Sequence, residues 1–168
     1  MIIAVDGSAA SGKGTLSKRL ANYFDLAHLD TGSLYRALAL QLLSTGTNSD
    51  DIDENQVIKE SLRLDLGLCS APEIRTDSVA SIASKIAALP EVRANLLALQ
   101  RSFASDSSHE NGAVLDGRDI GSVVLPKTQI KLFIDAKLEV RAKRRFKELL
   151  RAGQSAMFRD VLEDMRER

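Results

Sequence analysis

The sequence lacks the features that mark several large classes of protein. Its 168 residues include one cysteine, Cys69, which cannot close an internal disulfide or build a multi-cysteine metal site. No apolar run approaches the roughly 20 residues that a membrane-spanning helix needs. Residues 1–6 lack the basic start and the cleavage pattern of a signal peptide. These absences predict a cytoplasmic protein without a membrane partner.

The sequence also has no excess of charge of either sign. Lys and Arg number 23, and Asp and Glu number 23. Proteins that bind nucleic acid or anionic membranes usually carry a basic excess, so the neutrality argues against both partners. The composition, 44% hydrophobic and 27% charged, is globular, and 168 residues fit one domain with its own core. Neutrality and the lack of a heptad repeat favour a monomer.

Apolar runs alternate with helical patterns along the chain. Buried strands are predicted at about residues 1–5, 26–30, 113–117 and 130–135. Helices are predicted at about residues 13–24, 34–43, 54–63, 77–88, 90–104, 136–152 and 155–165. This alternation predicts an α/β fold, in which helices cover both faces of a parallel sheet. The weakly patterned stretch at about 44–80 predicts an appendage to a single domain of residues 1–168.

Spacing also predicts how two of these helices are placed. The apolar face of the first helix is predicted to carry Leu16, Leu20, Tyr23 and Phe24. Ser155 is predicted to cap the last helix, because Gly153 ends the preceding one and apolar residues recur from Met157 onward.

A phosphate-binding motif follows the first predicted strand. The segment Gly7-Ser8-Ala9-Ala10-Ser11-Gly12-Lys13-Gly14-Thr15 contains G-x-x-x-x-G-K, followed by Gly-Thr, between a strand and a helix. Glycines let the backbone close around an anion, and the amides and the helix N-terminus favour its charge. Lys13 is predicted to reach the β- and γ-phosphates of ATP, and the Thr15 hydroxyl to face a Mg²⁺ ion. A glycine-rich turn that binds nothing would not need the lysine, the threonine and this spacing together.

Other classes that use such a loop find less support. A GTPase would need an Asn-Lys-x-Asp guanine reader and an Asp-x-x-Gly switch, and the sequence has neither. The chain is also too short for a motor ATPase. A small kinase that moves a phosphoryl group between two small molecules remains.

A second cluster of polar residues closes the third predicted strand. Asp116 stands where P-loop proteins carry a carboxylate beside Mg²⁺, although a turn-forming aspartate is the alternative. Gly117 permits close approach of a ligand, and Arg118 and Asp119 add a guanidinium and a second carboxylate. The other candidates for binding a phosphorylated acceptor are Tyr35, Arg36 and Arg75. Arginine forks match phosphate oxygens, but an arginine taken alone is more often a surface residue.

Taken together, these motifs resemble the bacterial cytidylate kinases. The matching blocks are Gly7–Thr15, Leu29–Arg36, Glu73–Thr76, Asp116–Gly121 and Leu132–Ala136, in order through nearly the whole chain. The resemblance implies transfer of the γ-phosphoryl group of ATP to CMP or dCMP, with Mg²⁺, on a parallel sheet. These nucleotides are the expected partners.

The resemblance also implies that the appendage at about 44–80 binds the acceptor nucleotide, and it indicates particular binding residues. They are Thr31, Tyr35, Arg36, Arg75, Arg118 and Asp119. Asp119 is expected to accept a hydrogen bond from the cytosine amino group, for which a carboxylate is the natural partner. Arg36 and Arg118 are expected to hold the α-phosphate, and Tyr35 to pack or orient rather than react.

On the donor side, residues 7–15 and Arg144 are expected to bind ATP. Arg144 belongs to a basic cluster with Arg141, Lys143 and Arg145, and a solvated helix face is the alternative for each of them. The expected catalytic residues are Lys13, Arg118 and Asp116. Transfer is expected to be direct and in line, because no serine, histidine or cysteine is placed to act as a nucleophile. His28 and His109 are interpreted as structural, and Cys69 as incidental.

The sequence departs from the family pattern in two places. It is shorter between Leu64 and Glu73 than the usual acceptor-side insertion, and it stops at Arg168, about where the family's lid begins. A fifth strand and a terminal helix are expected beyond that point. Three alternatives stay open: a nucleotide-binding protein with little catalysis, a P-loop kinase with another acceptor such as AMP or shikimate, and a GTPase-like switch.

Overall fold

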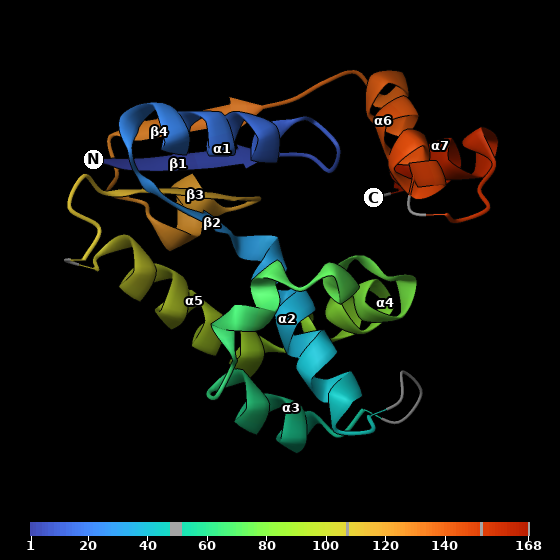
Figure 1. Ribbon diagram of the computed structural model, residues 1–168, viewed down its shortest axis with the longest axis horizontal. Coiled ribbons are helices and arrows are strands. Elements are labelled where there is room, and N and C mark those ends of the chain that lie inside the picture. Colours follow the sequence, from blue (N-terminus) through green and yellow to red (C-terminus); the bar gives the residue numbers. More distant parts are fainter. Residues whose placement is uncertain (48–51, 107, 152, 168) are drawn as a thin grey trace.

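Four parallel strands form the centre of the fold. The computed structural model describes residues 1–47, 52–106, 108–151 and 153–167. Within these ranges the strands are β1 (Ile2–Gly7), β2 (Ala27–Asp30), β3 (Ala113–Gly117) and β4 (Ile130–Ile134), in the sheet order β2-β3-β1-β4 (Figure 1). All three pairings are parallel. The predicted α/β fold and its four strands are therefore confirmed.

Helices connect these strands and cover both faces of the sheet. They are α1 (Lys13–Phe24), α2 (Thr31–Ser44), α3 (Glu54–Ser61), α4 (Asp77–Ile86), α5 (Pro90–Ala104), α6 (Leu138–Arg151) and α7 (Phe158–Glu167). Three single turns add η1 (Leu66–Ser70), η2 (Pro72–Arg75) and η3 (Ile120–Val124). Because side chains alternate along a strand, Ile3 and Val5 pack with Ala21 of α1, and Ala4 belongs to the core on the opposite face.

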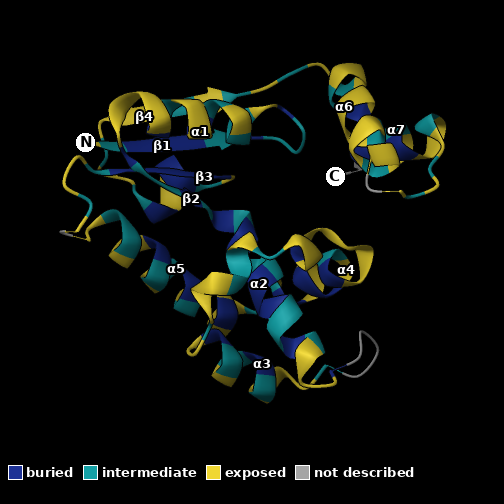
Figure 2. Ribbon diagram, viewed as in Figure 1, coloured by how far each residue is buried: buried dark blue, intermediate teal, exposed yellow. Residues whose placement is uncertain are grey.

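That opposite face is continuous with a lobe of helices. The largest core cluster joins Ala4 and Leu115 of the sheet to fully buried residues of α2, α3 and α5, such as Leu38, Val57 and Leu96 (Figure 2). The predicted appendage at 44–80 corresponds to the end of α2, then α3, η1 and η2, and the start of α4; its residues 48–51 lie outside the described ranges. The role of this appendage in acceptor binding stays a prediction.

A second projection, the α6–α7 arm (residues 138–167), follows β4 (Figure 1). Its core is built from Ala142, Val161 and Met165, and Ala9 and Ala10 of the phosphate-loop segment pack against it. The arm therefore packs directly against the phosphate-loop segment. Within the described ranges, no helix is both long enough and apolar enough to span a bilayer.

The structure corrects two details of the helices. Tyr23 is 82% exposed and Phe24 43% exposed, so they do not form the buried face of α1. Ser17 and Ala21, one turn apart, do so, because their small side chains let the helix lie close to the sheet. The last helix begins at Phe158 rather than after Ser155. The carbonyl group of Met157 accepts the hydrogen bond from the amide of Val161, which closes the first turn.

Candidate active site

The phosphate loop connects the end of β1 to the first residue of α1. Gly12 has φ of 99° and Ala10 φ of 58°, which place both residues in the left-handed region and turn the chain sharply before Lys13. In the described part of the chain, no side chain caps α1 at this end. The first amides of the helix, together with its dipole, therefore face outward as an anion site.

The loop is held against the end of β4. A Cβ atom added to Gly7 would collide with the carbonyl oxygen of Ile134, so only glycine fits there. The Ser8 hydroxyl donates a hydrogen bond of 2.7 Å to Oδ1 of Asp135. This bond is the main cause of a lowered pKa of the Asp135 carboxyl, and the Ala136 amide and Arg141 act in the same direction. The edge of the loop is thereby fixed by an ionised carboxylate.

Two polar side chains of the loop, those of Lys13 and Ser11, bear on anion binding. The Lys13 ammonium lies 3.5 Å from the carbonyl oxygen of Ser8, so it folds back over the loop that precedes it. The Ser11 hydroxyl is buried and has no hydrogen-bond partner among the described residues. An unsatisfied buried hydroxyl costs about 1–3 kcal/mol, and a phosphate oxygen in the loop would remove that cost.

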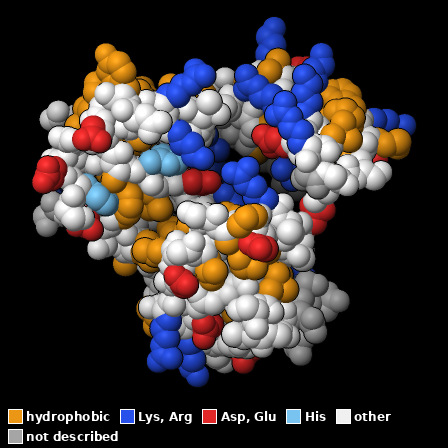
Figure 3. All heavy atoms as spheres, viewed as in Figure 1, with side chains coloured by type: hydrophobic (Ala, Val, Ile, Leu, Met, Phe, Trp, Pro, Cys, Tyr) orange, Lys and Arg blue, Asp and Glu red, His pale blue; other side chains and the backbone are white. Residues whose placement is uncertain are grey.

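A basic hollow opens beside the loop, between α1 and α6. It has a volume of about 590 Å³, and its cationic lining residues are Arg19, Arg144, Lys147 and Arg151. The Arg144 guanidinium also donates to the carbonyl oxygens of Ala10, at 3.2 Å, and Ser11, at 2.7 Å. Figure 3 shows Lys and Arg side chains gathered around the central hollow and over the adjacent arm. These features suit a polyphosphate.

The other arginines of the α6 cluster have different partners. Arg141 donates to the carbonyl oxygen of Ala136 and lies 4.0 Å from Asp135, whereas Arg145 pairs with Glu148 on its own helix at 3.6 Å. Of the three candidates, Arg144 is therefore the one that contacts the phosphate loop. Its role in binding ATP remains a prediction.

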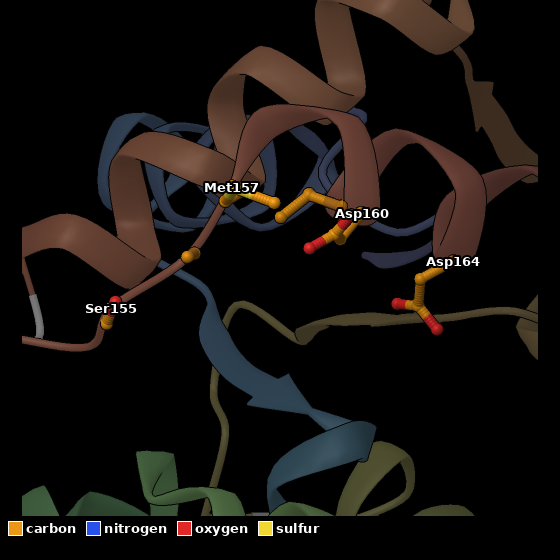
Figure 4. A pocket seen from close by; sticks show the side chains of 6 residues that line it. Ser155, Met157, Asp160 and Asp164 are labelled. Carbon is orange, nitrogen blue, oxygen red and sulfur yellow. The ribbon is translucent and has the colours of Figure 1, made fainter.

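A further hollow, of about 450 Å³, lies at the start of α7 (Figure 4). Asp160 and Asp164 line it from α7, and Ser155 and Met157 line it from the segment before that helix. Its two carboxylates would repel a phosphate. The basic hollow is therefore the better candidate for the phosphorylated donor.

Asp116 lies at the carboxyl end of β3 and is 2% exposed. Its backbone carbonyl accepts a hydrogen bond of 2.9 Å from the Thr31 hydroxyl, and its Oδ2 atom lies 2.7 Å from Nε2 of His28. Its Oδ1 atom is turned toward Gly14, where it would lie 3.9 Å from an added Cβ atom. A buried carboxylate thus faces the first turn of α1.

The donor set around this turn fits Mg²⁺. The ion prefers oxygen ligands and usually keeps several waters while it binds substrate phosphates and one or two carboxylates. Asp116 supplies the carboxylate, and Thr15, an exposed residue directly after Gly14, can supply its hydroxyl. His28, which the sequence indicated to be structural, is the direct partner of this carboxylate.

The candidate acceptor residues form two ion pairs. Arg36 donates to Oδ2 of Asp30 at 2.9 Å, while Oδ1 of Asp30 caps α2 by accepting from the Gly32 amide. Arg93, near the start of α5, donates to Oδ2 of Asp119 at 3.2 Å. Arg93 is not predicted from the sequence, because only the tertiary fold brings α5 to the end of β3.

Tyr35 lies near the second of these pairs. Burial raises the pKa of its hydroxyl; Arg93 acts in the opposite direction and Asp119 in the same direction as burial. The hydroxyl is therefore protonated at neutral pH, as expected of a residue that packs or donates a hydrogen bond. Arg75 ends η2 with an exposed side chain, and no polar contact joins it to Arg36, Arg118 or Asp119 in the described ranges.

Asp6 fixes the segment that carries Arg118 and Asp119. Its two carboxylate oxygens accept hydrogen bonds from the amides of Ile120, at 2.7 Å, and Gly121, at 2.8 Å. Asp6 is also paired with Gly117 across β1 and β3, and it immediately precedes the phosphate loop. One carboxylate therefore joins the donor loop to the acceptor segment.

Replacing Asp6 with asparagine is expected to destabilise the fold by about 1–3 kcal/mol, because the new amide group would face a backbone N–H that then lacks an acceptor. Urea denaturation followed by circular dichroism measures the change in the free energy of unfolding. An unchanged free energy would contradict the structural role of these two hydrogen bonds.

The fold and the site together define a class of protein. The phosphate loop lies between a strand and a helix and has basic side chains beside it. A second polar cluster lies at the end of β3, the neighbouring strand in the sheet. This combination is typical of a P-loop phosphotransferase for small substrates. The family model described as cytidylate kinase matches residues 3–168. The chain belongs to the cytidylate kinase family.

Individual relatives agree with the family match. A cytidylate kinase of Paramagnetospirillum magneticum is 48% identical over 167 residues, which cover 99% of this chain and 78% of that protein. A cytidylate kinase of Azorhizobium caulinodans is 49% identical over 168 residues, which cover 100% of this chain and 79% of that protein.

A solved structure is similar in fold. The crystal structure of an uncharacterized protein from Eubacterium ventriosum superposes with a TM-score of 0.51 at 15% sequence identity, and the match covers 99% of this chain and 70% of that one. At this identity the likeness concerns the fold alone, and it supports an α/β fold.

Proposed function

We propose that this chain, an ATP-dependent kinase of CMP or dCMP, binds ATP on the phosphate loop and the acceptor around Arg36, Arg118 and Asp119. The unpartnered buried hydroxyl of Ser11 carries this proposal, because it lies within a loop shaped for phosphate and has no other partner in the described residues. The Lys13 ammonium and the Arg144 guanidinium each lie within hydrogen-bond distance of a backbone carbonyl of the same loop.

The reaction is a direct displacement. An oxygen of the acceptor phosphate attacks the γ-phosphorus of ATP, the bond from that phosphorus to the bridging β–γ oxygen breaks, and ADP leaves with the bond electrons. Such a reaction depends on positioning and on the neutralisation of charge rather than on a covalent enzyme intermediate. Lys13 neutralises charge on the donor phosphates, and Arg118, next to the end of β3, does so on the acceptor side.

Mg²⁺, when bound with ATP, would supply further neutralisation between the β- and γ-phosphates. Thr15 and Asp116 are the residues that would hold it, Asp116 through water. Within the chain, the Thr31 hydroxyl donates a hydrogen bond to the backbone carbonyl of Asp116.

The acceptor residues change partners when CMP binds. Arg36 exchanges Asp30 for the α-phosphate, so the existing pair holds the guanidinium near the site before the nucleotide arrives. Asp119 turns from Arg93 to accept a hydrogen bond from the cytosine amino group. Uracil presents a carbonyl group at that position, which a carboxylate repels.

The acceptor is tested in a coupled assay with CMP, dCMP, UMP, AMP and shikimate. CMP and dCMP are expected to give the highest kcat/KM. A preference for AMP or shikimate would overturn the acceptor assignment while leaving the phosphate loop as the donor site. A preference for GTP over ATP would instead support a GTPase-like switch. Monomeric state and cytoplasmic location stay predictions, the first open to sedimentation.

Replacing Asp119 with asparagine is expected to raise the KM for CMP about tenfold or more, since a good contact to a base edge is worth about 1–3 kcal/mol. The KM for ATP should hardly change. Asp106→Asn is the matched control, because that carboxylate lies on a distant exposed loop. Equal losses for both substrates would remove Asp119 from the acceptor pocket.

A further inference from the structure

Asp116 belongs to the predicted set of site residues, whereas its partner His28 does not. Nε2 of His28 lies 2.7 Å from Oδ2 of Asp116, and the two side chains are 18% and 3% exposed. In the sheet His28 is paired with Val114, so Asp116 is its diagonal neighbour on the same face. The contact is thus built by two adjacent strands rather than by a loop.

The two carboxylate oxygens of Asp116 have different surroundings. Oδ2 accepts the His28 hydrogen bond, while Oδ1 is turned toward Gly14 in the first turn of α1. A carboxylate free to rotate about its χ2 angle could present either oxygen. The Nε2–H group of the imidazole removes that freedom by donating a hydrogen bond to Oδ2. Groups that orient a metal's carboxylate contribute about 10- to 100-fold to metal affinity or activity.

We propose that His28 is a positioning residue for the Mg²⁺–ATP complex: its Nε2–H group holds Oδ2 of Asp116 and thereby keeps Oδ1 directed at the phosphate loop. This inference rests on the proposed function, since it takes Asp116 as the carboxylate beside Mg²⁺. His28 does not touch the nucleotide; it acts through Asp116. A purely structural buried pair would instead affect folding and all ligands alike.

Two substitutions of His28 test the proposal, because one keeps a hydrogen-bond donor at the position of Nε2 and the other removes it. In His28→Gln the amide nitrogen reaches the position of Nε2, so Asp116 keeps its donor. In His28→Asn the amide ends about where Nδ1 was, so the donor is lost although a polar side chain remains. Calorimetry with ATP in the presence of Mg²⁺ and in the presence of EDTA, and with CMP, separates the metal-dependent part of binding.

His28→Asn is expected to bind Mg²⁺–ATP about 10- to 100-fold more weakly, with ATP in EDTA and CMP bound as before. His28→Gln is expected to stay within about threefold of the unchanged protein. In an Asp116→Asn background, His28→Asn should have no additional effect, because His28 acts only through that carboxylate. His109→Gln is the control, since the His109 ring hydrogen-bonds to the Phe103 carbonyl and packs on the Phe103 ring in a distant loop.

Several results would overturn the proposal. One is a His28→Asn protein with undiminished Mg²⁺–ATP affinity; another is an equal loss for ATP in EDTA and for CMP. If His28→Asn does not fold, a folded His28→Gln protein that loses the Mg²⁺-dependent affinity also overturns it. Failure of the proposed function looks different, because the unchanged protein would then bind neither ATP nor CMP.

Discussion

Replacing Lys13 with methionine is expected to lower kcat about 100- to 1,000-fold, the cost of removing one preorganised group that stabilises transition-state charge. The ammonium of Lys13 lies over the phosphate loop, 3.5 Å from the carbonyl oxygen of Ser8, where it would meet the γ-phosphate. Methionine preserves the length and the apolar stem of the side chain. A coupled assay gives kcat, and thermal unfolding establishes that the protein is folded.

Lys18→Met is the matched control for this experiment. Lys18 is exposed on the same helix, α1, so its substitution changes the net charge equally without touching the loop. It should leave kcat within about twofold. A Lys13→Met protein that retains more than a tenth of its kcat would remove Lys13 from the donor site. An unfolded Lys13→Met protein would show that Lys13 is needed for folding.

The strands and the phosphate loop could be predicted because their signals are local. A short β-branched run that ends in glycine, followed by the spaced glycines and Lys13, specifies strand, turn and helix without any distant residue. The structure confirms β1 at Ile2–Gly7 and α1 from Lys13. Asp116 and Asp119 could be selected for the same reason, since each stands at or just after the end of an apolar run.

The partners of these residues could not be predicted in the same way. His28 meets Asp116 because β2 lies beside β3, and the sheet order is not written in the spacing of either strand. Arg93 meets Asp119 because α5 packs against β3 and the turn η3 that follows it. Asp6 directly follows the first predicted strand, and no local pattern indicates that it binds two amides 114 and 115 residues away.

For two aromatic residues of α1 the local pattern itself is misleading, because it predicts an apolar face and the structure shows both side chains exposed. Tyr23 and Phe24 fit an apolar helical face by spacing. In the structure their rings instead contact each other edge to face near the C-terminus of the helix, with 4.8 Å between the ring centroids. Hydrophobic spacing identifies a helix better than it identifies the buried side, since large apolar residues are often exposed singly.

Replacing Arg118 with alanine is expected to have the largest effect on the acceptor side, a loss of about 10³-fold in kcat, at the lower end of what an arginine at the transferring phosphoryl group contributes. Arg36 is paired with Asp30 and Arg93 with Asp119. Among the described residues the guanidinium of Arg118 has no such partner. Arg118 directly follows Gly117, which is the strand partner of Asp6 in the sheet, and Asp6 lies next to the phosphate loop.

The comparison with Arg118→Lys separates charge from geometry. Lysine keeps the charge but lacks the planar fork that binds two phosphate oxygens at once, so it should recover only part of the rate. Arg63→Ala, an exposed arginine just after α3, controls for the loss of a positive charge and should leave kcat unchanged. If Arg118→Ala raised only the KM for CMP, the guanidinium would bind the acceptor without stabilising the transition state. If both parameters were unchanged, Arg118 would be a surface residue, and the neutralisation of the acceptor phosphate would fall to Arg36.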